Sequence, residues 1–198
     1  MFCFVAKSLC VAQNKNFHSL SKYEKRWAFL HPCAAAKIKK HQAEMYSVYN
    51  EVKKHNLLDT FSNGGKLDAF RHTFAMAYFS KYVSTKKLRK LGKAHEKGNY
   101  LQFLNGKTED GELPDSVSSI MDLKNNEIGF SMAKEIKKLS AEEIEQKVIQ
   151  RILAGGVFII KRNNAGVYLD CDGNIISLEK IKGKWNIPKC LTTSGSVP

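Results

Sequence analysis

The sequence lacks the short motifs that identify the common catalytic machineries. Its 198 residues contain no GxSxG, no P-loop, no HExxH and no GxGxxG. These absences leave serine-hydrolase, nucleoside-triphosphatase, zincin and dinucleotide-binding functions without support. No two cysteines are spaced as CxxC, which argues against a zinc ribbon. Beyond its first residues, the chain also has no apolar run approaching the ~20 residues of a membrane span.

The first residues themselves have the pattern of an export signal. MFCFVAKSLCVAQ places an apolar run before Ala12 and Gln13. This pattern predicts a signal peptide over residues 1–12 and an exported chain, in the periplasm or outside the cell. Lys7 interrupts the run and no basic segment precedes it, which a start codon assigned too far downstream would explain. The alternative is an apolar N-terminal strand or helix.

Cysteine usage is consistent with an oxidising compartment. Three of the five cysteines, Cys33, Cys171 and Cys190, follow the predicted signal peptide. An odd number allows at most one bridge and leaves one thiol free. Cys171 and Cys190 lie in the same C-terminal segment, so we expect these two to pair if the compartment is oxidising.

The chain has a formal net charge of +13, and its lysines cluster in short runs. These runs fall mostly on helix faces opposite the apolar stripe, which favours solvated faces. An anionic envelope partner, whether lipid, glycan or phosphoester, is the next interpretation. Nucleic acid comes last, because the sequence has no base-stacking or groove-reading motif.

Capping and breaking signals divide residues 13–156 into about five to six helices. Ser21 with Glu24, and Ser140 with Glu143, have the spacing of capping boxes. The expected helices run from Ser21 past Leu30, from Pro32 towards Leu57, through Asp68 and His72, from Ser84 to about Phe103, from about Ser118 towards Leu139, and from Ser140 to Gly155. Residues 105–116 are expected to form a polar loop.

The residue pattern changes from helix to strand after residue 156. VFIIKR, VYLDC and IISLEK have strand composition and are separated by the turn sequences NNAG and DGN. We therefore expect an antiparallel β-meander within residues 157–192, with WNIPKC as an edge piece and residues 193–198 as a frayed tail. Three strands are too few to fold alone, so they should pack on the helices. The predicted class is α+β, mostly α.

Polar side chains one helical turn apart interrupt three of the apolar helical patterns. The pairs are Asp68 with His72, His95 with Asn99, and Asp122 with Asn126. A spacing of four residues puts both members of a pair on one helix face. Burying such groups is costly unless they pair with one another or bind something. Three such pairs therefore predict one shared polar site, and Gly98 and Gly129 beside them would let helices approach closely.

The strings around these pairs resemble those of a known family. GGKLDAFRH, AHEKGNY and MDLKNNEIG stand at residues 64–72, 94–100 and 121–129. They are similar to the marker strings of an uncharacterised family of secreted bacterial proteins, a domain of unknown function. The resemblance covers most of the mature chain and implies a mostly helical domain exported to the cell envelope. It brings no known activity.

The residue types of the predicted site support a metal-dependent chemistry. Oxygen and imidazole donors that suit a divalent metal within a helical bundle come from Asp68, His72, His95 and Asp122. Glu96 would then activate a metal-bound water as general base. The reaction class would be hydrolysis of an anionic envelope substrate.

The same residues also support a chemistry without metal. His72 and His95 would act as an acid/base pair oriented by the two aspartates, and Arg71 would hold a phosphate or carboxylate. Hydrogen-bonding support around these groups is expected from Asn99, Asn125 and Asn126. The alternative is a non-enzymatic envelope protein, in which the polar clusters lock the helices together and the basic faces bind anionic lipid or glycan.

Overall fold

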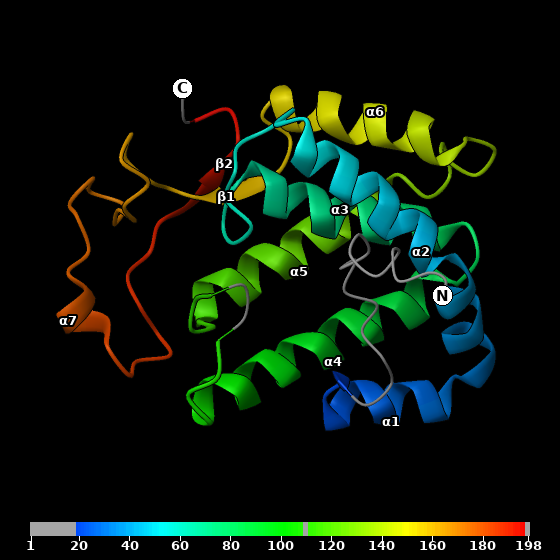
Figure 1. Cartoon of the computed structure of the whole chain (residues 1–198), viewed down its shortest axis with the longest axis horizontal. Helices are drawn as coiled ribbons and strands as arrows, with labels where there is room; N and C mark the ends of the chain where they lie inside the picture. The colour runs from blue at the N-terminus through cyan, green and yellow to red at the C-terminus, as the bar shows by residue number, and fades with distance from the viewer. Residues whose placement is uncertain (1–18, 109–110, 197–198) are drawn as a thin grey trace, which may run out of the picture.

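The computed structural model describes residues 19–108 and 111–196. Its elements are α1 (Lys22–Leu30), α2 (Pro32–Lys54), α3 (Lys66–Ser80), α4 (Thr85–Leu104), α5 (Ser116–Ser131), α6 (Ala141–Leu153), β1 (Phe158–Ile160), α7 (Leu178–Ile181) and β2 (Leu191–Thr193) (Figure 1). The predicted class, α+β and mostly α, is confirmed. The predicted cleavage after Ala12 lies outside the described residues. No helix of the described part is both long and apolar enough to cross a membrane.

Local signals set most of the helix boundaries. Both predicted capping boxes are present, at the starts of α1 and α6. Pro32 occupies the first turn of α2, where its missing N–H costs nothing. The α5 helix begins at Ser116, because the Asp115 carboxylate accepts hydrogen bonds from the Val117 and Ser118 N–H groups. It ends at Ser131 instead of running towards Leu139, and turns follow it.

The core is built around α3, which packs against α2, α4, α5 and α6. The buried aromatic side chains of α3 stack along the helix, from Phe70 to Phe74 to Tyr78. On the α5 side the two backbones meet closely, since a Cβ at position 129 would lie 2.4 Å from the carbonyl oxygen of Thr73. Gly129 therefore brings α5 onto α3, as its lack of a side chain predicted.

The C-terminal segment differs from the predicted meander. β1 pairs antiparallel with β2, with Phe158 opposite Thr193 and Ile160 opposite Leu191. Between them, strand-like pairing is limited to isolated bridges such as Arg162 with Tyr168. The third predicted strand is wrong, because α7 begins at Leu178. The NNAG and DGN turns do form, but the partner of residues 158–160 is a distant segment and not the one after the first turn.

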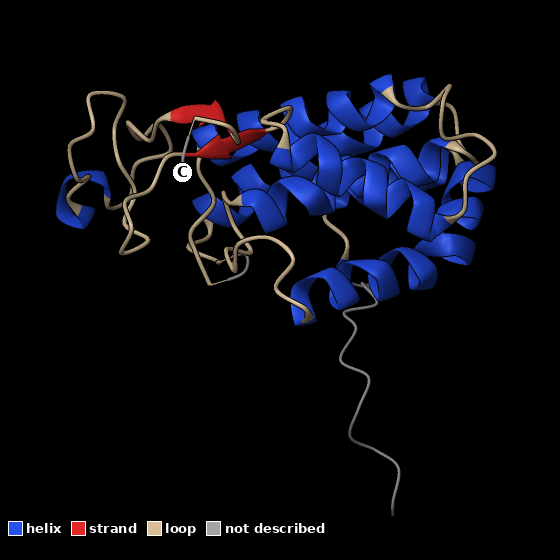
Figure 2. Cartoon of the chain, turned by 90° about the horizontal axis from the view of Figure 1, so that it is seen from above, coloured by secondary structure: helices blue, strands red, loops and turns tan. Residues whose placement is uncertain are grey.

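The end of the chain is anchored more firmly than predicted. Thr193 belongs to β2, and Ser194 is buried with its hydroxyl donating to the Ile152 carbonyl oxygen at 2.7 Å. Residues 193–196 are therefore not a frayed tail. Figure 2 shows the two strands lying along one end of the helical body, with the loops of the C-terminal segment projecting beyond it.

The predicted disulfide is confirmed. Cys171 and Cys190 are bonded, with Cα atoms 4.7 Å apart and a separation of 19 positions in sequence. Cys33 is a free cysteine on the exposed side of α2. The bridge closes the loops of the C-terminal segment immediately before β2, and so ties them to the strand that packs on the helices.

Candidate functional site

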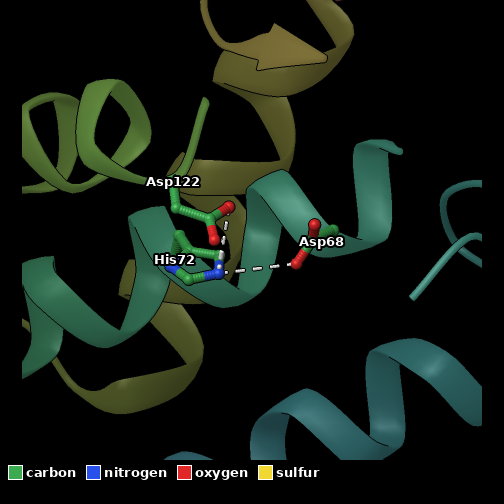
Figure 3. A group of neighbouring side chains, drawn as sticks. All are labelled: Asp68, His72 and Asp122. Atoms are coloured by element: carbon green, nitrogen blue, oxygen red, sulfur yellow. Dashed lines mark ion pairs between the residues drawn. The ribbon is translucent and has the colours of Figure 1, made fainter. Parts of the chain in front are cut away.

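Three of the predicted site residues come together where α3 and α5 cross. The Nε2 atom of His72 lies 3.5 Å from Asp68 Oδ1 and 3.3 Å from Asp122 Oδ1 (Figure 3). The three ligand-type atoms lie within 4.8 Å of one another, and all three side chains are buried. Asp68 and His72 share one face of α3, while Asp122 reaches them from α5 across the close contact at Gly129.

A cationic side chain stands inside the same group. The Arg71 Nη2 atom donates to Asp68 Oδ1 at 2.7 Å and lies 3.4 Å from His72 Nε2. The other oxygen of Asp68 accepts a hydrogen bond from the Gly64 backbone N–H at 2.7 Å, at the start of α3. Arg71 thus offsets part of the charge that two neighbouring carboxylates would otherwise leave in a buried position.

The group borders a cavity of about 1330 Å³. Arg71 and His72 line this cavity, whereas Asp68 and Asp122 do not. The imidazole therefore separates the cavity from the two carboxylates behind it. This is the arrangement in which an imidazole can exchange protons with a bound molecule while buried acids fix its orientation.

Two amide side chains also line the cavity. Asn126 is 3% exposed, and its Oδ1 atom has no hydrogen-bond partner among the described residues. The Gln102 Oε1 atom is also buried and likewise has no hydrogen-bond partner among the described residues. Gly92 on α4 leaves room for the Asn126 side chain, because a Cβ at position 92 would lie 2.9 Å from Asn126 Nδ2. Buried acceptors without partners are uncommon in folded proteins and often mark binding sites.

His95 lines the cavity but is not among the three residues whose ligand-type atoms lie within 4.8 Å of one another. Its Nδ1 atom lies 3.1 Å from Glu24 Oε1 on α1, so the predicted four-residue cluster has three members. The sequence marked Glu24 only as the capping residue of α1. Burial raises the pKa of Glu24, but the hydrogen bond and charge of His95 outweigh burial and lower the pKa from 4.5 to about 2.

The remaining predicted residues have other neighbours. Asn99 donates to Glu96 Oε2 at 3.2 Å one turn away on α4, and neither residue lines the cavity. The Asn125 amide bonds both the N–H and the carbonyl oxygen of Phe158, each at 2.9 Å. Asn125 therefore fastens β1 to α5. Glu96 is not placed to activate a molecule in the cavity, and Asn125 supports the fold.

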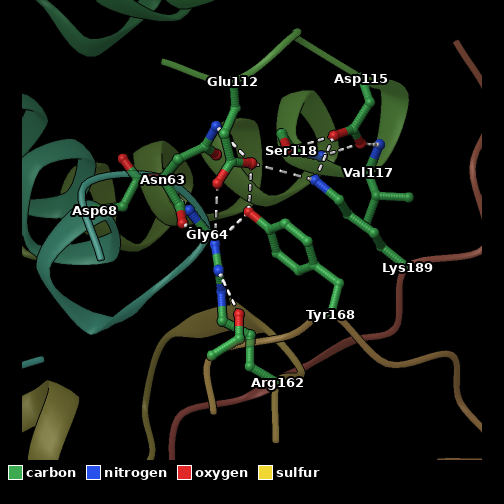
Figure 4. A network of polar contacts seen from close by, with 11 residues as sticks. Asn63, Gly64, Asp68, Glu112, Asp115, Val117, Ser118, Arg162, Tyr168 and Lys189 are labelled. Atoms are coloured by element: carbon green, nitrogen blue, oxygen red, sulfur yellow. Dashed lines mark hydrogen bonds and ion pairs between the residues drawn. The ribbon is translucent and has the colours of Figure 1, made fainter. Parts of the chain in front are cut away.

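A second polar cluster, which is not predicted from the sequence, joins the C-terminal segment to the helices. Lys189 Nζ donates to Asp115 Oδ2 at 2.8 Å, and the Tyr168 hydroxyl donates to Glu112 Oε2 at 2.7 Å (Figure 4). The Tyr168 ring lies between two cations, with Lys189 Nζ and Arg162 Cζ each 3.7 Å from its centroid. Burial and the neighbouring Glu112 raise the pKa of Tyr168.

This cluster reaches the candidate site through the loop before α3. Arg162 Nη2 donates to the Asn63 carbonyl oxygen at 2.8 Å, and the next residue, Gly64, donates to Asp68. Figure 4 shows Arg162 and Asp68 on either side of this short loop. Arg162 and Tyr168 fall in predicted strands, but no local pattern indicates that their side chains meet Glu112 and Asp115, which lie about 50 residues earlier in the chain.

Comparison with known proteins gives one match. A family model described as Domain of unknown function (DUF6973) matches residues 25–156. No curated protein matches the chain. No solved structure matches it either. The matched region begins at the fourth residue of α1 and contains the rest of α1 and the whole of α2 to α6. It includes every residue of the Asp68–His72–Asp122 group.

Proposed function

The chain belongs to the family described as a domain of unknown function (DUF6973), and for this member we propose the function of an exported hydrolase acting on an anionic component of the cell envelope. The observation that carries the proposal is the position of His72. Its imidazole lines a large cavity, and its Nε2 atom faces two buried carboxylates. A histidine held in this way is suited to general acid–base catalysis.

The proposed mechanism assigns the proton transfers to His72. Asp68 and Asp122 hold a proton on Nε2, which leaves Nδ1 as the basic nitrogen of the ring. Nδ1 takes a proton from water as the water oxygen bonds to the phosphorus or carbonyl carbon of the substrate. The bond to the leaving oxygen breaks, and His72 returns the proton to that oxygen. The net change is the addition of one water molecule across the ester bond.

Arg71 is the proposed binding residue for the anionic group of the substrate. Its side chain is a quarter exposed and lines the cavity beside His72. A guanidinium group recognises phosphate and carboxylate through two parallel hydrogen bonds, which fixes the bound group in orientation as well as in place. Asp68 in turn holds the guanidinium at 2.7 Å.

The disulfide supports the export part of the proposal. Disulfides persist in the periplasm and outside the cell and are rare in the cytosol. The Cys171–Cys190 bridge is consistent with the apolar, signal-like residues 1–12. The proposed location is therefore the periplasm or the extracellular space.

A metal-dependent hydrolase is the second candidate, favoured by the spacing of the three ligand-type atoms. Donor atoms about 3 Å apart can share one divalent ion. Arg71 opposes this candidate, because its guanidinium already neutralises Asp68 from 2.7 Å. Metal analysis of the purified protein separates the two: the acid–base proposal predicts less than a tenth of an equivalent of metal and full activity in chelator.

The activity test compares the wild type with His72→Gln on chromogenic phosphodiesters and acyl esters. We expect hydrolysis by the wild type and a loss of about a thousandfold or more in the variant. His55→Gln is the matched control, since His55 is exposed at the end of α2 and pairs with Glu51 on the protein surface. A wild type without hydrolysis above buffer, or equal rates for His72→Gln, would contradict the proposal and favour the non-enzymatic envelope protein.

A further inference from the structure

The cavity has two chemically different sides. Its polar end carries Arg71, His72 and Asn126, and Gln102 also lines the cavity. The wall formed by α1 and α2 is mostly apolar, with Ala28, Ala35, Ile38 and Met45, although Glu24, Gln42 and Asn50 also belong to it. A ligand that fills both sides must be amphiphilic, because apolar surface left against this wall would forfeit the free energy of its burial.

The cavity is also large for a small polar substrate. At about 1330 Å³ it exceeds the roughly 300–1,000 Å³ typical of sites for drug-sized ligands. Phe29, which is 84% exposed, lines it as well, so the apolar wall continues out to the protein surface. A phosphate or sugar head group alone would contact only the polar end and leave the α1–α2 wall unused.

The charged side chains that line the cavity favour a head group of negative charge. Arg71 lies at the polar end, and the exposed lysines Lys39 and Lys53 also line the cavity. These three cationic side chains outnumber Glu24, the one carboxylate among the described lining residues, and so favour an anionic ligand.

The unpartnered amides specify the head group further. Asn126 Oδ1 and Gln102 Oε1 are buried acceptors without a partner among the described residues. Acceptors of this kind are satisfied by hydroxyl donors.

We infer that the cavity binds a single molecule of an anionic lipid with a hydroxylated head group, as in glycerol-bearing phospholipids. The phosphate lies at Arg71, a head-group hydroxyl lies at Asn126, and the acyl chain lies against the α1–α2 wall. This inference rests on the proposed function and names its substrate class. It places the ester bonds of the lipid beside His72.

The test is calorimetric titration of the full chain carrying His72→Gln, which removes the proposed chemistry and leaves binding measurable. The probes are monomeric lysophosphatidylglycerol, lysophosphatidylcholine with the same chain, and glycerophosphoglycerol without a chain. We expect one lysophosphatidylglycerol per protein, bound about tenfold or more tightly than either other probe. Equal affinity for glycerophosphoglycerol would overturn the inference, since the apolar wall would then contribute nothing.

Two further variants locate the site. Ala35→Trp fills the apolar wall and should weaken lysophosphatidylglycerol binding by tenfold or more, whereas Cys33→Trp places the same ring on the exposed side of α2 and should leave it unchanged. Asn126→Leu, which removes an amide that has no partner among the described residues, should weaken binding by about tenfold. Unchanged affinity in both Ala35→Trp and Asn126→Leu would show adsorption elsewhere on the surface and overturn the inference.

The outcome separates this inference from the proposed hydrolase. Binding to His72→Gln without turnover by the wild type would remove the hydrolase and keep the lipid site. Turnover of short soluble esters by a protein that binds no lysophosphatidylglycerol would keep the hydrolase and remove the lipid site.

Discussion

The buried Glu24 and the partly buried His95 form a pair that links α1 to the cavity wall. One carboxylate oxygen of Glu24 accepts the Ser21 N–H at 2.8 Å and so completes the capping box, while the other lies 3.1 Å from His95. The same residue therefore starts α1 and fixes a cavity-lining histidine of α4. Glu24 and His95 are 71 residues apart, so no local pattern could predict their contact.

The first prediction concerns the pH dependence of this pair. Glu24 has a pKa of about 2 in the folded protein, below its ordinary value of 4.5, so its contribution to stability is fully present above pH 4.5 and is lost as the pH falls towards 2. We expect Glu24→Gln to lower the free energy of unfolding at pH 7 by about 1–3 kcal/mol. Urea unfolding should show this difference shrinking between pH 4.5 and 2.

Glu143→Gln is the control for this prediction, because Glu143 completes the capping box of α6 but has an exposed bond and no histidine partner. We expect a loss below about 1 kcal/mol. A loss at Glu24 that is no larger, or one that stays constant down to pH 2, would mean that the pair with His95 adds no stability.

Helix starts and inward faces were predictable at the scale of elements, because their causes are local. The Ser21–Glu24 and Ser140–Glu143 spacings and Pro32 placed three helix starts correctly. Pairing between short strands was not predictable. β1 and β2 have three residues each and are separated by 30 residues of loops, turns and the short helix α7, so nothing local distinguishes β2 from the nearer candidates.

The candidate site was predictable where its residues share a helix face. Asp68 and His72 stand one turn apart on α3, and the apolar pattern of α5 directed Asp122 towards them. His95 was expected in the same group because, with Asn99 one turn away, it interrupts the apolar pattern of its helix. It lies instead against α1, whose position depends on Gly98 meeting Ser21 across the α1–α4 contact. Such helix-to-helix placement depends on packing between distant segments.

The second prediction tests the close contact between α3 and α5. Gly129→Ala would gain about 1 kcal/mol from helix propensity if the added methyl group met no neighbour. The methyl group would, however, lie 2.4 Å from the Thr73 carbonyl oxygen and 2.9 Å from the Ala77 nitrogen. We expect a net loss of about 2–4 kcal/mol in the free energy of unfolding, measured by urea denaturation.

Ser119→Ala on α5 is the reference for Gly129→Ala, since it changes a partly exposed position of the same helix. It should alter stability by less than about 0.5 kcal/mol. A Gly129→Ala variant as stable as this reference would show that α3 and α5 can move apart without loss of stability. The close contact at Gly129 would then not explain how Asp122 is held beside Asp68 and His72.

The C-terminal segment supports the whole molecule through a buried ion pair and an adjacent disulfide. Lys189 bonds Asp115, which caps α5, and the adjacent Cys190 carries the disulfide. Because α5 also carries Asp122, the C-terminal segment braces the helix that completes the candidate site. The family match ends at residue 156, so this brace lies outside the matched region.

The third prediction concerns the disulfide. Replacing Cys171 and Cys190 by Ser opens a loop of 19 residues, and the chain-entropy relation gives a loss of about 3 kcal/mol in the free energy of unfolding. Thermal and urea unfolding measure the loss. Cys33→Ser removes the exposed free thiol and should leave stability unchanged. Equal stability of the double variant and Cys33→Ser would show that the bridge does not hold the segment in place.

The central claim is that the Asp68–His72–Asp122 group serves binding and catalysis and not the stability of the fold. Its most direct test is the free energy of unfolding of Asp122→Asn at pH 7. The Asp68 and Asp122 oxygens lie within 4.8 Å of each other, so the substitution removes a repulsion between two buried carboxylates. The account predicts a variant as stable as the wild type or more stable, as is common where function strains a site. A loss of about 3 kcal/mol or more would contradict it, because a structural network loses that much when one buried partner is removed.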